Sequence, residues 1–203
     1  METNNNYLES VKKQFLYYKT LGEKAMEQLE PEQLFVSTND DTNSIAVIVK
    51  HISGNMLSRW TDFLTSDGEK EWRNRDDEFE NTIETKEELL QLWNKGWDCL
   101  FNAINPLTDE QLTNIIYIRN EGHTVIEAIN RQLAHYPYHI GQIVFYAKML
   151  KNTNWDSPTD KARFQAEARF FRAYAYRTLV YLYGDVPYVE TILYDFQLNF
   201  TRT

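Results

Sequence analysis

Apolar residues recur every three or four positions over four long stretches of the chain, a spacing that predicts amphipathic α-helices. We expect these helices at about residues 5–29, 43–64, 85–104 and 124–151. Thr85 and Thr124 are each followed three positions later by a glutamate, the pattern of a capping box at a helix N-terminus. Pro31 and Pro106 follow the first and third stretches, where a proline readily ends a helix.

The segments between the expected helices complete the picture of a bundle. DGEKEWRNRDDEFEN, between the second and third helices, is a long charged loop. Residues 115–118, the Asn-Glu-Gly turn that follows them and Val125 indicate a small hairpin. Asn43 or Ser44 is expected to cap the second helix. Four helices joined by such loops predict an all-α fold of the four-helix-bundle type.

The last part of the chain differs in composition from the rest. Residues 160–203 hold 6 Lys/Arg and 5 Asp/Glu, which leaves 15 and 25 for residues 1–159, and they hold 11 of the 29 aromatic residues. The turn-forming segment NTNWDSPTDK is the natural junction between the two compositions. We therefore expect residues 1–156 to form the bundle and residues 157–203 to be an appendage with an extra aromatic helix, not an independent domain.

Composition excludes several classes of function. A formal net charge of −9 argues against a nucleic-acid partner, because such proteins concentrate positive charge. Without an apolar run of 18 residues or a secretory signal, we expect no membrane partner and a cytoplasmic protein. The single cysteine, Cys99, excludes an internal disulfide and a thiolate metal cluster, which leaves histidine and carboxylate as ligands.

The histidines are the candidates for chemistry. His135 and His139 differ by four positions, so both project from one face of a helix about one turn apart and can chelate a metal. His51 lies in an apolar run of the second helix, where an imidazole is costly to bury without a partner. Together the three would give a divalent ion three nitrogen ligands and open positions. Partly buried histidines with satisfied hydrogen bonds are the alternative, and His123 is interpreted as a surface or capping residue.

Three polar residues are candidates to line a pocket beside these histidines. Gln142, three residues past His139, can bond a ligand imidazole or bound solvent. Asn55 and Arg59 follow His51 by about one and two helical turns and are placed to line the mouth of the pocket. An ion pair with the acidic loop is an equally good explanation of Arg59. No catalytic residue is assigned from the sequence.

Pro137 stands between the two paired histidines. It removes the hydrogen bond that residue 137 would donate to the carbonyl of Leu133, which favours a kink. Our hypothesis is that this kink adjusts His135 relative to His139. The alternative is a helix that begins later, near Tyr136.

Two long segments of the sequence resemble those of a known family. KHISGNMLSRWTDFLTSDGEKEWRNRDDEFE, at 50–80, and RQLAHYPYHIGQIVFYAKMLK, at 131–151, resemble the DinB/YfiT-like superfamily, with a similarity that covers about residues 5–156. The resemblance implies an up-down-down-up four-helix bundle, commonly a homodimer, with a divalent metal, zinc or nickel, on His51, His135 and His139. Some relatives are thiol-dependent S-transferases that use bacillithiol, mycothiol or glutathione, and many have no known activity.

These points lead to a functional expectation. We expect a metal-dependent enzyme in which the ion activates a thiol or a water, such as a transferase that joins a low-molecular-weight thiol to a small electrophile. The thiol would arrive as a cosubstrate, because Cys99 lies between apolar positions inside the third helix. The alternative is a non-catalytic metal-binding or stress-associated module.

The appendage carries a second resemblance. AEARFFRAYAYRTLVYLYGDVPYV, at 166–189, resembles a helix of the SusD/RagB family of glycan-binding lipoproteins. The similarity covers about residues 162–190, a small fragment of that family, so glycan binding is only a weak third hypothesis. We expect the aromatic helix to dock on the bundle or on a partner subunit, and a loosely packed appendage is the alternative.

Overall fold

The computed structural model describes residues 7–39 and 42–158. By its internal contacts the chain divides into two units, Met1–Pro158 and Thr159–Thr203. The aromatic helix expected within residues 166–189 and its docking lie outside the described residues. Within the described ranges, every helix falls short of the length or the apolar character that crossing a bilayer demands.

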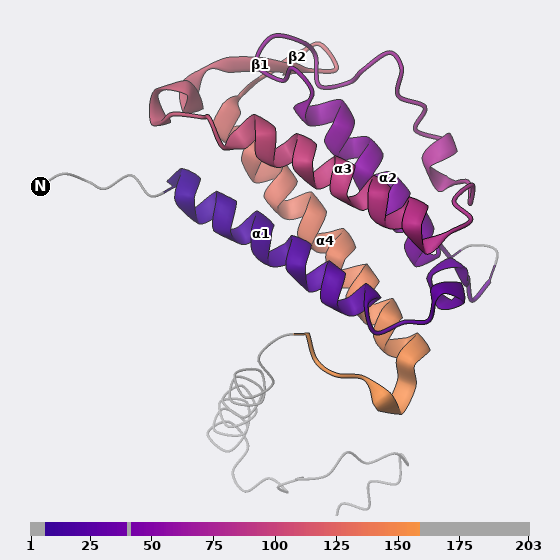
Figure 1. Ribbon diagram of the computed structural model, residues 1–203. Helices are drawn as coiled ribbons and strands as arrows, with labels where there is room; N and C mark the ends of the chain where they lie inside the picture. Colours follow the sequence, from indigo (N-terminus) through magenta and orange to yellow (C-terminus); the bar gives the residue numbers. More distant parts are fainter. Residues whose placement is uncertain (1–6, 40–41, 159–203) are drawn as a thin grey trace, which may run out of the picture. The chain divides into compact units, whose positions relative to one another are not determined.

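Four long helices form the framework and confirm the all-α bundle expected from the sequence (Figure 1). They are α1 Tyr7–Met26, α2 Ile45–Trp60, α3 Lys86–Ile104 and α4 Val125–Lys151. The side chains of Ser44, Thr85 and Thr124 accept hydrogen bonds from backbone N–H groups in the first turns of α2, α3 and α4. For α3 and α4 the glutamate three residues on completes a capping box, as the sequence predicts.

The helices run up, down, down and up. The Tyr7 hydroxyl at the start of α1 lies 2.6 Å from Asn130 Oδ1 near the start of α4, and Gln28 just past the end of α1 bonds to Asp156 beyond α4. These two helices are therefore parallel. The α2 and α3 helices are parallel as well, and residues 61–85 run back along the bundle to join them.

The core lies between the helices and is rich in large rings. Trp93, Trp97, Phe15 and Tyr136 are almost completely buried, and burying a side chain such as that of Phe15 contributes on the order of 1.5–3 kcal/mol of stability. The Tyr136 hydroxyl accepts a hydrogen bond from Trp60 Nε1 at 3.0 Å and donates one to an amide oxygen of α2. This ring thus fixes α4 against α2 by packing and by hydrogen bonding.

A small hairpin precedes α4, as expected. Strands β1 Ile115–Ile118 and β2 Glu121–Thr124 are antiparallel. The turn is at Arg119 and Asn120, both with positive φ, which suits the right-handed twist of a two-residue hairpin loop. Short 3-10 helices occupy connections, and the one that matters for the site is η2 Asp77–Phe79. The others are η1 Pro31–Phe35, η3 Asp109–Thr113 and η4 Asn152–Asn154.

Candidate metal centre

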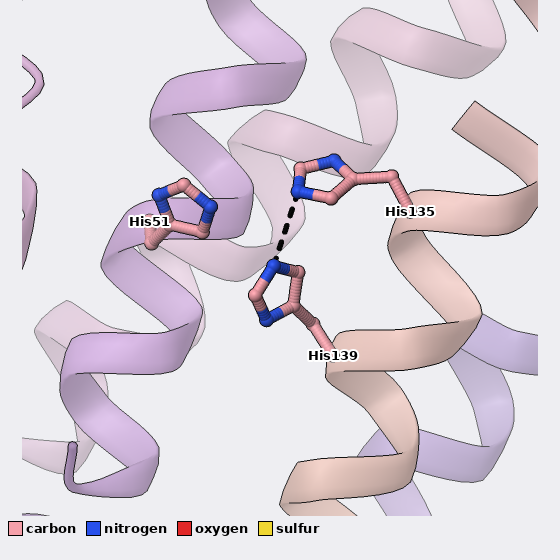
Figure 2. Close-up of side chains that lie close together, drawn as sticks. All are labelled: His51, His135 and His139. Atoms are coloured by element: carbon pink, nitrogen blue, oxygen red, sulfur yellow. Dashed lines mark hydrogen bonds between the residues drawn. The ribbon is translucent and has the colours of Figure 1, made fainter. Parts of the chain in front are cut away.

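Three imidazoles meet between α2 and α4. His51 comes from α2, and His135 and His139 come from successive turns of α4 (Figure 2). One ligand nitrogen from each lies within 4.8 Å of the other two, and Nε2 of His135 lies 3.0 Å from Nε2 of His139. His51 is buried, and the other two rings are partly buried. The structure thus brings together the three histidines that the sequence singles out.

Each of these rings has an oxygen partner at its other nitrogen. Nδ1 of His51 donates to Glu78 Oε2 at 3.0 Å, and Nδ1 of His139 donates to Gln142 Oε1 at 2.8 Å. Nδ1 of His135 donates to Oε1 of Gln132 at 3.3 Å. A carboxylate or amide oxygen only accepts, so each Nδ1 carries a proton and Nε2 is the nitrogen left to bind an ion.

The consequence is a cluster of three imidazoles, each with one nitrogen that can act as an electron-pair donor to an ion. Burial, with the charges of His139, His51, Arg59 and Arg73, lowers the pKa of His135 to about 4. Burial lowers the pKa of His139 too. Nε2 of His135 and Nε2 of His139 lie at hydrogen-bonding distance, 3.0 Å, so the two atoms already point to one place. Tetrahedral zinc with Zn–N bonds of ~2.0–2.1 Å spaces its nitrogens by about 3.4 Å, so the donor set fits such an ion after small movements.

Glu78 holds His51 in place and is itself held by Arg73. It is buried, and Nε and Nη2 of Arg73 donate to its two oxygens at 2.7 and 2.9 Å. Burial alone would raise the pKa of Glu78, but the hydrogen bonds from His51 and Arg73 outweigh it and lower the pKa. Phe79 stacks on the His51 ring with centroids 4.9 Å apart. A metal-binding histidine is commonly oriented by a carboxylate in this way.

Gly54 makes room for that carboxylate. It lies about one turn beyond His51 on α2, and a Cβ at this position would overlap Oε1 of Glu78. The absence of a side chain is therefore what lets Glu78 approach the helix and reach the imidazole.

The structure places the three pocket candidates as follows. Gln142 is bonded to His139, and its amide nitrogen donates to the Tyr138 hydroxyl at 3.1 Å. Asn55 Oδ1 accepts from the buried Tyr136 hydroxyl at 3.1 Å. Arg59 forms an ion pair with Glu69 of the charged loop, which was the alternative explanation of this residue. His123, on β2, is outside the histidine triad.

Pro137 lies inside one continuous helix. Because α4 runs from Val125 to Lys151 without interruption, the alternative of a helix that begins near Tyr136 is wrong. The proposed effect of the kink on His135 and His139 stays a prediction.

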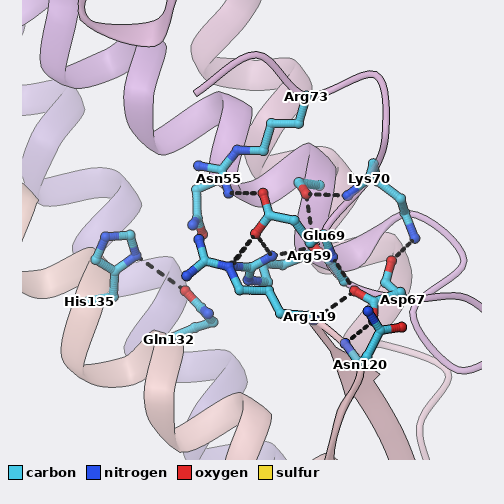
Figure 3. Close-up of polar contacts among 12 residues, drawn as sticks. Asn55, Arg59, Asp67, Glu69, Lys70, Arg73, Arg119, Asn120, Gln132 and His135 are labelled. Carbon is cyan, nitrogen blue, oxygen red and sulfur yellow. Dashed lines mark hydrogen bonds and ion pairs between the residues drawn. The ribbon is translucent and has the colours of Figure 1, made fainter. Parts of the chain in front are cut away.

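The charged loop is fastened to the hairpin by two acids (Figure 3). Asp67 accepts hydrogen bonds from the backbone N–H groups of Arg119 and Asn120 at 2.9 and 2.7 Å. Glu69 Oε2 accepts from both terminal nitrogens of Arg59 at 3.1 Å and from Nε of Arg119 at 3.0 Å. This fastening closes one side of a cavity of about 210 Å³ next to the triad, which His51 and His135 also line.

Comparison with protein families gives one finding. Residues 2–160 match the model of the family DUF1572, whose description is 'Protein of unknown function'. The chain belongs to the DUF1572 family. No curated protein and no solved structure gives a significant match to it. The family match contains the three histidines and ends within the junction that precedes the aromatic segment, so the SusD/RagB resemblance lies outside the DUF1572 region.

Two residues of the site in this DUF1572 chain, Gln132 and Glu78, were not expected from the sequence. Gln132 stands three residues before His135, just as Gln142 stands three residues after His139, and this symmetry in the sequence was a usable signal. Glu78 gave no comparable signal, because it is one of many acids in a loop and reaches His51 only through the fold.

Proposed function

We propose that the chain is a member of the DinB/YfiT-like superfamily whose histidine triad binds zinc or nickel and activates a nucleophile. The observation that carries this proposal is the convergence of one imidazole nitrogen from each of three histidines on two helices, with an oxygen bonded to Nδ1 of each ring. The triad is the one group of this kind found among the described residues, and it offers three ligands. Structural zinc sites usually have four protein ligands, so three favour an ion with an open position.

When bound, the ion would lower the pKa of a coordinated thiol or water and so supply a nucleophile at neutral pH. The protein's part is to keep its own ligands neutral, so that they leave the charge of the ion undiminished. Burial does this for His135 and His139 by lowering the pKa of each ring. Glu78 and the two glutamines hold the protons on Nδ1 and keep Nε2 directed inward.

The thiol of a transfer reaction would have to come from outside the chain. Cys99 is on α3, with its sulfur 3.5 Å from the Thr61 hydroxyl, and it lines a different cavity from the one beside the triad. A low-molecular-weight thiol with a small electrophile is therefore our proposed substrate pair. A non-catalytic metal-binding module is the alternative, and the cavity that opens beside the ligands favours the enzyme.

Metal analysis tests the proposal directly. The full chain is loaded with zinc or with nickel, desalted, and analysed for bound metal by mass spectrometry. We expect one ion per chain in the wild type and in His123→Ala, which removes the histidine outside the triad, and loss of the ion in His51→Ala. Wild-type protein without stoichiometric metal, or His51→Ala protein that retains it, would refute the metal centre.

Activity is tested separately on the loaded protein. Model electrophiles are screened with different low-molecular-weight thiols, and conjugation that requires both metal and His51 supports the transferase. Metal binding without any conjugation favours the non-catalytic module. The homodimer and the cytoplasmic location stay predictions, and light scattering of the full chain tests the first of them.

A further inference from the structure

Every arginine in the described part of the chain lines one cavity. Residues 7–39 and 42–158 contain five arginines and ten lysines. None of the lysines lines the cavity beside the histidine triad, whereas all the arginines do, and these are Arg59, Arg73, Arg75, Arg119 and Arg131. They come from α2, the charged loop, the hairpin turn and α4. Segments that are distant in sequence thus each place an arginine side chain at the same cavity.

The positive charge of this cavity exceeds the negative charge that is paired with it. Glu69 forms ion pairs with Arg59, Arg73 and Arg119, and Glu78 forms one with Arg73. No acidic residue lines the cavity itself. Two paired carboxylates face five guanidinium groups, which leaves an excess of about three positive charges.

Arg75 and Arg131 account for most of this excess. Both side chains are exposed, and neither forms an ion pair with any residue of 7–39 or 42–158. The other three arginines are held by carboxylates, so their positions are set before a ligand arrives. Within the described residues, Arg75 and Arg131 are therefore the two arginines whose guanidinium groups are wholly unpaired, and Nε of Arg59 is a further buried donor without a partner.

Arginine in this number is suited to one kind of ligand. Its planar guanidinium offers paired N–H donors that match the two oxygens of a carboxylate or phosphate, which a lysine cannot do. In a chain with a formal net charge of −9, a positive cavity also concentrates small anions locally. A cavity of ~150 Å³ can hold a molecule the size of benzene, so the volume of about 210 Å³ is room for a small molecule.

We propose that this cavity binds the anionic end, a carboxylate or phosphate group, of the small molecule whose other end reaches the histidine triad. Arg75 and Arg131 make contacts that form on binding, and Arg59, Arg73 and Arg119 provide the fixed positive wall. The identity of the reactive end rests on the proposed function. The binding of an anion does not, because the arginines and their carboxylates are independent of a metal.

The test measures anion binding by calorimetry on the full chain, both metal-free and zinc-loaded, at constant ionic strength. Succinate and inorganic phosphate are the probes, and the tighter of the two identifies the kind of anionic group. We expect saturable binding of one anion per chain, weakened at least about tenfold in the double variant Arg75→Gln/Arg131→Gln. Lys13→Gln/Lys95→Gln removes the same charge from exposed positions of α1 and α3 and should bind as the wild type does.

Two further results separate the possible explanations. Arg131→Lys keeps the charge and loses the paired donors, so we expect weaker binding than in the wild type. The proposal is overturned if neither anion binds, if the double arginine variant binds as the wild type does, or if the lysine control weakens binding equally. Arginine-dependent anion binding in protein that takes up no zinc would sustain this inference while refuting the metal centre.

Discussion

Gly54→Ala offers the sharpest test of how the site is built. The new methyl group would overlap the Glu78 carboxylate, which would have to move away from α2. That movement separates Glu78 from His51, to which it is hydrogen-bonded, and from Arg73, with which it forms a buried ion pair. Disrupting a buried pair costs about 3 kcal/mol at the lower end of measured values, and the better helix propensity of alanine returns about 1 kcal/mol. We expect a net destabilisation of about 2 kcal/mol.

Gly141→Ala is the matched control. Gly141 is also inside a long helix, α4, but a Cβ there meets no atom within 4 Å. The same substitution should therefore raise the free energy of unfolding by up to about 1 kcal/mol, through helix propensity alone. The two alanine variants are expected to change stability in opposite directions.

Urea unfolding of the metal-free chain at pH 7, followed by circular dichroism, measures both values. Zinc affinity, measured by competition with a chelating dye, should fall about 10–100-fold in Gly54→Ala because His51 loses the partner that orients it. The reasoning is refuted if Gly54→Ala is as stable as the wild type, or if it is stabilised to the same degree as Gly141→Ala.

Three other predictions follow from single contacts. Gln132→Ala should weaken zinc binding about 10-fold by freeing the His135 ring, whereas Gln91→Ala on the exposed face of α3 should not, as the same dye competition would reveal. Tyr136→Phe leaves two buried polar partners unsatisfied and should cost about 1–3 kcal/mol in urea unfolding; an unchanged midpoint would contradict the described hydrogen bonds. Burial acts to raise the pKa of Glu69, but its arginine partners lower it overall. Its stabilisation is thus present above the unfolded-state pKa of about 4.3 and is lost as pH falls through the folded-state pKa. Glu69→Gln should therefore destabilise the chain at pH 7 and much less at pH 3, and an equal loss at both would count against the ion pairs.

The helices were predictable because their signals are local. Apolar spacing and the threonine caps at Thr85 and Thr124 depend on neighbours within one turn, and both were found where expected. The second helix ends at Trp60 and not at residue 64, although the apolar pattern continues. Thr61 is extended and Asp62 has a positive φ, so the backbone leaves the helix while Phe63 remains buried.

The surroundings of the triad were only partly predictable, for the opposite reason. Gln142 is fixed by spacing on its own helix, so sequence reasoning found it. Glu78 and Glu69 bond to residues that are distant in sequence. No feature of the sequence distinguishes these two glutamates from the other acidic residues of the loop. The clustering of the arginines has the same origin, since their positions in the sequence follow no period.

The parallel pairing of α2 with α3 has a consequence for how this family can vary. Because α2 and α3 begin at the same end of the bundle, the connection between them has to run back along its whole length. Residues 61–85 form this connection. On the way they pass the histidines and contribute Glu69, Arg73 and Glu78. The return path required by topology thus also lines the cavity beside the triad, through Arg73 and Arg75. Changes in its sequence can alter the charge and shape of that cavity while the helices that hold the imidazoles stay as they are.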